Sequence, residues 1–256
     1  MKVVRLPSPC YNACMRVEPF AVGDYVHVLK RGARGLDIVQ DDSDKWRFLR
    51  LLFYMNDEYF DDNWVRALDE GSQTTFRPFA RPSGWPPRKP IVKILAYTLM
   101  PNHFHILLKE IVDGGISRFM QKIGQSMTLH FNEKHNQKGK GTIFQGSYKG
   151  KTVGDDIYLR YLAAYIMVKN VFELYPKGGI SGAIKNFEDA WQWAVKYQFG
   201  SLADYCTDRQ SPIITKDILG EIFNPISFKK FAKEMILGRK WIKGNGDPEF
   251  SILAIE

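Results

Sequence analysis

The sequence predicts an α+β fold, in which a central antiparallel sheet is flanked by helices and followed by a helical C-terminal extension. Three observations predict it. Residues 91–99 and 103–109 are apolar segments joined by the tight connection Pro101-Asn102, which is typical of an antiparallel hairpin. Residues 23–30 are a third segment with strand character. Residues 115–134 repeat apolar side chains every three or four positions, as in an amphipathic helix.

The N-terminal third contains one strand, one helix and one insertion. Residues 1–19 include three prolines and predict an irregular lead. The strand over 23–30 ends at Arg31-Gly32, and a helix from Ser43 to about Met55 follows it. Residues 57–90 are polar and rich in proline and glycine, which indicates a surface insertion or flexible loop outside the core.

The remaining elements are mainly helical. The apolar stripe of the helix over 115–134 consists of Ile116, Met120, Ile123, Met127 and Phe131. A further helix begins near Asp155 or Asp156, because either carboxylate can accept the first-turn amide hydrogens. Residues 187–205 are rich in aromatic side chains, and residues 215–239 predict two short helices split at Asn224-Pro225. We expect a main domain over 20–175, a helical extension over 176–243 and a tail over 244–256.

Composition narrows the class of protein. With 45% hydrophobic and 25% charged residues, the chain has the composition of a globular protein. Its net charge of +8 favours a polyanionic partner, although many proteins are mildly basic. The three cysteines are odd in number and scattered, which indicates reduced thiols. Cys10 and Cys14 lack the second pair of ligands that a zinc site would need. No stretch approaches the ~20 apolar residues of a membrane span, so we expect a cytoplasmic protein without a membrane partner.

Two histidines occupy alternate positions of the predicted strand over 103–109. Because successive strand side chains point to opposite faces, His103 and His105 share a face with Leu107. Two imidazoles on adjacent positions of one face can bind the same divalent cation. The alternative is a pair of ordinary histidines on a half-buried strand, because a metal site needs more than two side chains.

Four blocks of sequence resemble the single-tyrosine transposases, and most closely the REP-associated tyrosine transposases. Residues 100–105 (MPNHFH) resemble the HUH motif of this family. Residues 25–32 (YVHVLKRG) resemble its first strand, which usually ends in His-x-x-x-Arg-Gly. Residues 143–149 (IFQGSYK) resemble a Phe-Gln-Gly-basic segment, and residues 155–166 resemble the helix that carries the nucleophile. The blocks occur in the family's order over about residues 20–240.

The resemblance implies a function and a site. It implies an HUH endonuclease with a ferredoxin-like or RRM-like core, in which His103 and His105 hold Mg²⁺ or Mn²⁺. Tyr165 would be the nucleophile, with Tyr158 and Tyr161 as the alternatives on the same helix. Its attack would give a covalent 5′-phosphotyrosine link, so that the protein would cleave and transfer single-stranded DNA at hairpin or repeat ends.

A basic region follows the long helix and is interleaved with aromatic residues, which can stack on unpaired bases. With the resemblance, this predicts DNA contacts from Arg31, Gln145, Tyr148, Lys149 and Lys151. The cations of the helix over 115–134 either solvate it or flank a DNA groove. We expect the partner to be single-stranded or hairpin DNA in the nucleoid and the protein to be a monomer, with a dimer as the alternative.

The residue four positions after the tyrosine departs from the family. Relatives usually place Asn or Gln there as the third metal contact, but this chain has Lys169, followed by Asn170. An ammonium has no acceptor and cannot ligate a cation. Lys169 would then be a catalytic contact to phosphate or phenolate, with waters completing the metal shell. The alternative is a domesticated or inactive protein that binds hairpin DNA. A metal-dependent RNA or nucleotide phosphoesterase would need a carboxylate cluster, which the sequence lacks.

Overall fold

The computed structural model describes residues 20–59, 61, 64, 79–137 and 139–238. The predicted N-terminal lead, the tail over 244–256, Cys10 and Cys14 lie outside the described residues. The strands are β1 (Tyr25–Arg31), β2 (Val92–Leu99), β3 (His103–Glu110) and β4 (Lys149–Thr152). The helices of the first half are η1 (Ala33–Gly35), α1 (Asp42–Tyr54) and α3 (Gly115–Lys134). The later ones are α4 (Asp156–Ala164), η2 (Tyr165–Lys169), α5 (Asn170–Glu173), α6 (Gly179–Lys185), α7 (Phe187–Lys196), α8 (Leu202–Cys206), α9 (Asp217–Ile222) and α10 (Pro225–Leu237).

The strands form one antiparallel sheet in the order β2-β3-β1-β4. The strand that carries the histidines, β3, is an interior strand and pairs with β2 through the predicted hairpin. The predicted α+β fold with a central antiparallel sheet, flanking helices and a helical C-terminal region is therefore confirmed. Sequence reasoning missed β4, because its four residues, KGKT, show no alternation of apolar side chains.

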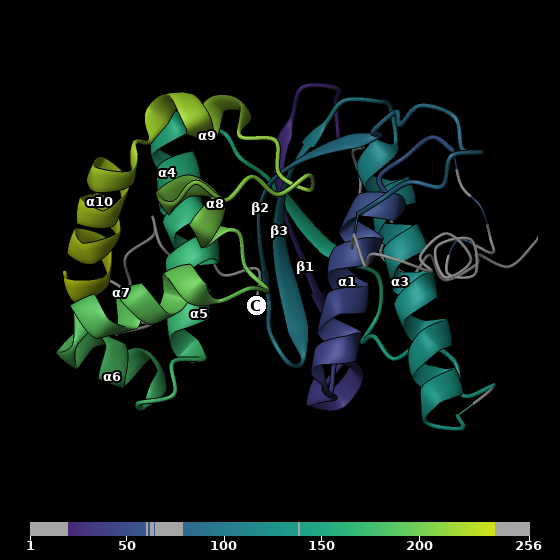
Figure 1. Cartoon of the computed structure of the whole chain (residues 1–256), viewed down its shortest axis with the longest axis horizontal. Helices are drawn as coiled ribbons and strands as arrows, with labels where there is room; N and C mark the ends of the chain where they lie inside the picture. The colour runs from purple at the N-terminus through teal and green to yellow at the C-terminus, as the bar shows by residue number, and fades with distance from the viewer. Residues whose placement is uncertain (1–19, 60, 62–63, 65–78, 138, 239–256) are drawn as a thin grey trace, which may run out of the picture.

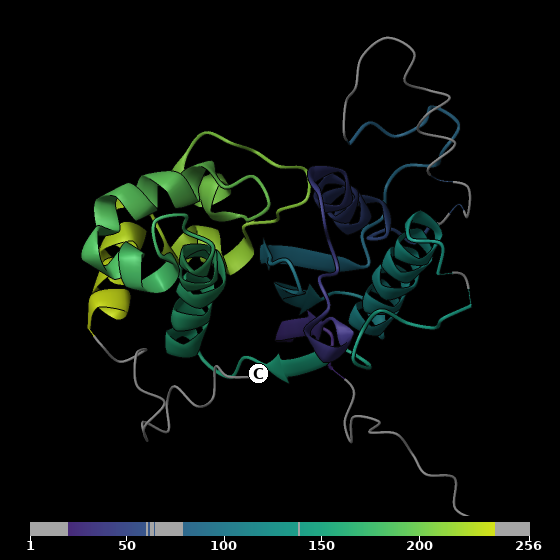
Figure 2. The ribbon, with the colours of Figure 1, turned by 90° about the horizontal axis from the view of Figure 1, so that it is seen from below.

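The sheet lies between two layers of helices, as Figures 1 and 2 show. Helices α1 and α3 cover one face, and the helices from α4 to α10 cover the other. The side chains of β3 divide between the two layers. Phe104 and Ile106 belong to the core beneath α1 and α3, whereas Leu107 belongs to the core beneath α4 and η2. The predicted alternation along this strand is confirmed, and it assigns the histidine face to the layer that contains the tyrosine.

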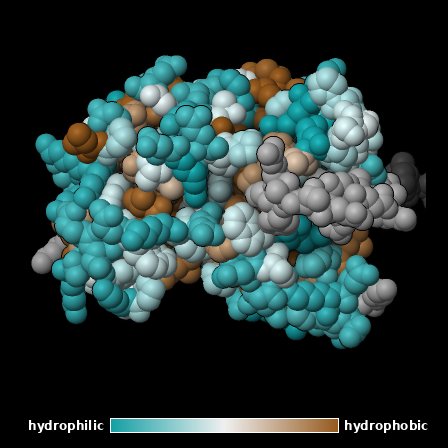
Figure 3. All heavy atoms as spheres, in the orientation of Figure 1, coloured by the Kyte–Doolittle hydropathy of each residue, from teal (hydrophilic) through white to brown (hydrophobic). Residues whose placement is uncertain are grey.

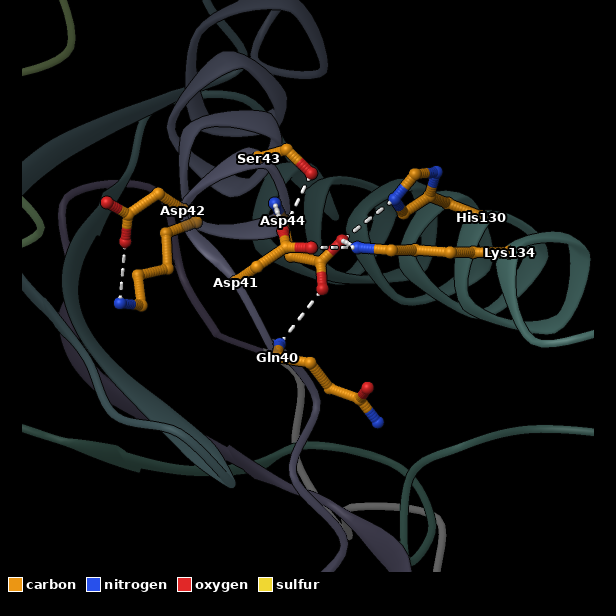
Figure 4. Close-up of polar contacts among 8 residues, drawn as sticks. Gln40, Asp41, Asp42, Ser43, Asp44, His130 and Lys134 are labelled. Carbon is orange, nitrogen blue, oxygen red and sulfur yellow. Dashed lines mark hydrogen bonds and ion pairs between the residues drawn. The ribbon is translucent and has the colours of Figure 1, made fainter.

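Helices α1 and α3 are held together by apolar packing and by ions. The predicted stripe of α3 is buried along its whole length. Asp44, in the first turn of α1, accepts hydrogen bonds from His130 and Lys134 of α3, and Lys134 also pairs with Asp41 (Figure 4). The cation near the end of α3 is therefore engaged in helix packing, which favours the structural interpretation of this residue over a DNA contact.

The insertion over 57–90 was expected to lie outside the core, and its described part corrects that expectation. Trp64 is buried in the core with α1, and the Tyr54 hydroxyl donates to the carbonyl of Ala80. Arg81 forms an ion pair with the buried carboxylate of Asp57. Residues 79–90 are irregular, as expected of a loop, but Trp64 and Asp57 connect the insertion to the core.

The C-terminal helices are attached to the edge strand β2. The hydroxyls of Tyr197 and Tyr205 donate to the carbonyls of Leu99 and Leu95, both at 2.8 Å. The predicted split between two short helices is present between α9 and α10, where Asn224 caps α10 and Pro225 begins it. Helices α4 to α10 thus form a layer that is fixed to the sheet at several points.

Hydrophilic residues cover most of the face drawn in Figure 3, with hydrophobic residues in small separate areas. None of the helices in the described part of the chain is both long and apolar enough to cross a membrane. Cys206, the cysteine within the described residues, is a free thiol.

Candidate active site on the histidine face of the sheet

Strand pairing brings the predicted site residues of β1 and β3 onto one face. In the antiparallel register, Arg31 lies opposite His103, and Leu29 lies opposite His105. Side chains of directly paired residues stand side by side on the same face of a sheet. The register therefore places Arg31 beside His103, on the face that also carries His105.

Gly32 allows the chain to turn sharply after Arg31. A Cβ atom at this position would lie 2.0 Å from the carbonyl oxygen of Leu36, a distance that no side chain tolerates. Gly32 also forms an isolated bridge with Phe144, and the amide of Gln145 donates to the carbonyl of Arg31. The Arg-Gly pair thus holds the segment around Gln145 against the end of β1.

His105 is almost completely buried and is electrically neutral. Its Nδ1 lies 2.9 Å from Nε2 of His27, and its Nε2 has no hydrogen-bond partner. Burial, followed by the charges of His27, His103, Lys169 and Arg31, holds the pKa of His105 well below its usual value. Burial, with a smaller effect of Lys151, lowers the pKa of His27 to about 3. The pair therefore stays neutral at physiological pH.

His103 lies beside His105 on the same strand. Its Nδ1 donates to the side-chain oxygen of Asn102 at 2.6 Å, which fixes the ring. The two ring centroids are 5.1 Å apart, with the rings nearly perpendicular. The predicted pair of imidazoles is therefore present on one face.

Of the three tyrosines on the following helix, Tyr165 is the one that meets the histidines. Its ring centroid lies 5.4 Å from that of His105 and 6.1 Å from that of His27, both edge to face. Tyr161 packs against Phe231, and Tyr158 lies beneath the ammonium of Lys151. The geometry thus separates Tyr165 from the two tyrosines that the sequence left as alternatives.

The helix is not a regular α-helix where it carries Tyr165. Residues 165–169 form one π-helical turn, and the amide of Asn170 donates to the carbonyl of Tyr165, five residues back. The hydroxyl of Thr98 on β2 donates to the carbonyl of Ile166 within this turn. With 3.6 residues per turn, the fourth residue after Tyr165 would lie beneath it, but this turn contains one residue more.

Lys169 lies at the side of Tyr165. Its ammonium is 4.7 Å from the centre of the Tyr165 ring and 2.6 Å from a carboxylate oxygen of Glu173. A cation over the face of a tyrosine ring is attracted by the electrons of that ring. Lys169 is thus close enough to Tyr165 to act on its hydroxyl or on a phosphate bound there.

The residues on this face fit a divalent cation in part. His105 offers a buried, neutral ring whose Nε2 has no hydrogen-bond partner, and metal ligation requires the neutral imidazole. If Nδ1–H of His105 donates to His27, Nε2 carries the lone pair that a metal needs, an arrangement common behind metal ligands. Within the described ranges, no group of three or more His, Cys, Asp or Glu residues could hold a metal ion. The described residues thus offer the two imidazoles of this face without a third ligand of these four types.

Most of the predicted DNA contacts gather next to these histidines. Arg31, Gln145 and Lys149 line a cavity of about 280 Å³. Lys151 lies opposite His27 in the register of β4 and β1. Tyr148 departs from this group, because its hydroxyl is hydrogen-bonded to Ser117 of α3 and its ring lines a different cavity, of about 630 Å³. The structure therefore brings four of the five predicted DNA contacts to the histidine face.

Sequence reasoning did not select His27, which contacts His105, or Thr98, which is bonded to the turn that carries Tyr165. His27 had a signal, since it is the histidine of the His-x-x-x-Arg-Gly pattern that ends at Gly32. Thr98 had none, because its contact is a hydrogen bond to a backbone carbonyl of the π-helical turn.

One comparison with known proteins, the match to a family model, agrees with the resemblance seen in the sequence. Residues 88–169 match the family model of IS200-like transposases, a segment that runs from just before β2 to Lys169. A solved structure of a REP-associated tyrosine transposase bound to a REP hairpin aligns with 79% of this chain and 90% of its own, at 14% identity and a TM-score of 0.40. No curated protein matches the sequence. The family match confirms the predicted resemblance to transposases.

Proposed function

We propose that this chain, whose residues 88–169 match the IS200-like transposases, is a metal-dependent endonuclease and strand transferase for single-stranded DNA. Its substrates would be hairpin or repeat ends of chromosomal DNA, which would place the protein at the nucleoid. The observation that carries the proposal is the contact of Tyr165 with His105, 5.4 Å between ring centroids, on the sheet face that also holds His103. A tyrosine hydroxyl beside two imidazoles on one face is an arrangement expected of a nucleophile next to a metal site.

Tyr165 would supply the nucleophile. Its phenol oxygen attacks the scissile phosphorus, and the bond from phosphorus to the 3′ oxygen breaks. The phenol loses its proton and the departing 3′ oxygen gains one, so that one P–O bond replaces another. The 5′ end remains on the tyrosine, and a second 3′ hydroxyl can reverse the step without another energy source. This chemistry accounts for both cleavage and strand transfer.

His103 and His105 would hold the cation, Mg²⁺ or Mn²⁺. When bound, such a cation polarises the phosphate and stabilises the charge that develops during attack. His27 would orient His105 through the 2.9 Å contact between their rings. Lys169, next to the ring of Tyr165, would stabilise the phenolate or the phosphate.

The cations around the histidines would bind the DNA backbone. Arg31, Lys149 and Lys151 come from the two strands beside β3, and Gln145 adds an amide that can hydrogen-bond to a base or phosphate. Tyr148 would act elsewhere, by stacking an unpaired base in the cavity beneath α3. This division predicts that the scissile strand and a second DNA segment contact different faces of the sheet.

One observation favours a second function, the binding of hairpin DNA without cleavage. Lys169 stands where relatives have a polar ligand, and its ammonium is paired with Glu173 at 2.6 Å. A chain that had lost its third ligand could keep the DNA-binding face while losing the nuclease. The two functions differ in whether a covalent adduct forms.

Adduct formation tests the proposal directly. The protein is incubated with a single-stranded hairpin labelled at its 3′ or its 5′ end and is then run on a denaturing gel. We expect the 3′ label to migrate with the protein and the 5′ label to be released, because the tyrosine keeps the 5′ phosphate. Tyr165→Phe should abolish the adduct and leave DNA affinity within a few-fold, since it removes a single hydroxyl.

Tyr161→Phe serves as the matched control, because Tyr161 packs against Phe231 away from the histidines. It should keep the adduct. An adduct at the wild-type level in Tyr165→Phe would reject Tyr165 as the nucleophile, and its absence from the wild type would favour the binding protein.

The metal requirement has a separate test. His103→Ala and His105→Ala should each eliminate cleavage, and EDTA should do the same to the wild-type protein. Added Mg²⁺ or Mn²⁺ should restore cleavage to the chelated wild type and not to either variant. Cleavage that continues undiminished in EDTA would rule out the metal-dependent mechanism.

A further inference from the structure

The π-helical turn changes which residue lies beneath the tyrosine. In an α-helix, the amide that donates to the carbonyl of residue i belongs to residue i+4. Here the amide that donates to the carbonyl of Tyr165 belongs to Asn170. Asn170 thus has the backbone relation to Tyr165 that position 169 would have in a regular helix. Lys169 precedes Asn170, and its ammonium lies over the ring of Tyr165 and is paired with Glu173.

The side chain of Asn170 is buried without a full set of partners. It is 1% exposed, and its amide nitrogen has no hydrogen-bond partner among the residues that the structure describes. Another buried asparagine, Asn56, shows the usual situation: its side chain donates to the carbonyl of Val92 and accepts from two backbone amides. A buried amide without partners costs free energy and calls for an explanation such as a bound ion.

We propose that Asn170, and not Lys169 or water alone, supplies the third protein ligand to the cation held by His103 and His105. The inference rests on the proposed function. A carboxamide oxygen is a suitable ligand for Mg²⁺ and Mn²⁺, and rotation of the amide group by half a turn exchanges its oxygen and nitrogen. The π-helical turn would then be the device by which this chain keeps an asparagine ligand despite a lysine at position 169.

Thr98 supports this arrangement. Its hydroxyl donates to the carbonyl of Ile166, inside the π-helical turn, from the strand next to the histidines. Thr98 is fully buried and lies opposite His105 in the register of β2 and β3. The same residue therefore neighbours a proposed ligand and fixes the turn that presents Asn170.

The test is the binding of Mn²⁺ to the full-length protein without DNA. Binding is measured by calorimetry and by the loss of the free Mn²⁺ signal in electron paramagnetic resonance. Asn170→Leu should weaken Mn²⁺ binding roughly tenfold or more. Its melting temperature without metal should stay equal or rise, because the substitution removes an unpartnered amide. Asn170→Asp should bind Mn²⁺ more tightly than the wild type, since a carboxylate adds charge.

Lys169→Ala and His105→Ala complete the experiment. Lys169→Ala should leave Mn²⁺ affinity within a few-fold, and His105→Ala should abolish binding. If His105→Ala weakens binding while both Asn170 variants match the wild type, the inference is wrong and the metal mechanism survives. If the wild type does not bind Mn²⁺, the metal mechanism fails as well. Should Asn170→Leu not fold, the Asn170→Asp comparison alone decides.

Discussion

At the scale of single residues, Lys169 decides whether the site is a working nuclease. Its ammonium can reach the phenol of Tyr165 or a phosphate beside it, yet it is also paired with Glu173. A half-buried ion pair of this kind stabilises a helix only weakly, so Glu173 can release the lysine to a phosphate at small cost. The proximity of Lys169 to Tyr165 favours a catalytic contribution.

We expect Lys169→Ala to slow adduct formation about a hundredfold, equivalent to ~3 kcal/mol, as when one charged transition-state contact is lost. Lys169→Asn should not restore the full rate, because Asn170 already lies beneath Tyr165. The measurement is the time course of adduct yield for the wild type and both variants on one hairpin, with Glu173→Gln as a control that keeps the lysine. A slow wild type and a faster Lys169→Asn would instead identify a decayed site.

The site residues differ in how far the sequence could predict them. Alternation along one strand was enough to place His103 and His105 together, and the family resemblance selected Tyr165. His27 reaches His105 only through the pairing of strands that are 78 residues apart in the chain. Asn170 is brought beneath Tyr165 by one additional residue in a helical turn, which no periodicity of the sequence reveals.

At the scale of elements, the boundaries that depend on local signals were predicted well. Helix α3 spans the predicted residues 115–134, and Asp155 caps α4 as expected, accepting from the amide of Tyr158. The edge strand β4 exists only because β1 offers unpaired backbone groups, and the described part of the insertion packs on α1 through Trp64. Both are tertiary effects that local composition does not contain.

Helix α9 is tied to the sheet by one carboxylate. Asp217 accepts hydrogen bonds from Lys93 at 2.7 Å, from Tyr25 at 2.6 Å and from Lys109 at 3.2 Å, one residue from each of three strands. Burial alone would raise the pKa of Asp217. The hydrogen bonds, from Lys93 first and then from Tyr25, outweigh burial and lower the pKa below its usual value.

This arrangement predicts a pH-dependent loss of stability. A carboxylate whose pKa is lower in the folded state stabilises the protein above about pH 3.9, its unfolded value, and the contribution fades as the pH falls below it. Asp217→Asn should therefore reduce the free energy of unfolding by roughly 1–2 kcal/mol at pH 7. The difference in the free energy of unfolding between the wild type and Asp217→Asn should become smaller toward pH 2.5, as measured by urea unfolding. Asparagine tolerates the left-handed backbone at this position, where φ is 43°. An equal difference in the free energy of unfolding at pH 7 and pH 2.5 would contradict the stabilising role of the Asp217 charge.

At the scale of the whole molecule, the sheet separates two functions. The face beneath α1 and α3 is covered by an apolar core. The other face carries the histidines and most of the predicted DNA contacts, and Tyr165 packs against it. The net charge of +8 is consistent with the proposed binding of a polyanion at that second face. The fold class followed from the hairpin and the amphipathic helix, whereas the position of the C-terminal layer on β2 depended on hydrogen bonds from Tyr197 and Tyr205.

The identity of the residue joined to DNA shows whether Tyr165 is the nucleophile. After reaction with a hairpin and Mn²⁺, nuclease and trypsin digestion should leave a short nucleotide on the peptide 161–169, which contains Tyr161 and Tyr165. Fragmentation in the mass spectrometer then distinguishes the two. We predict the nucleotide on Tyr165, attached through its 5′ phosphate. Attachment to Tyr161 or Tyr158, or the absence of any modified peptide, would contradict the account.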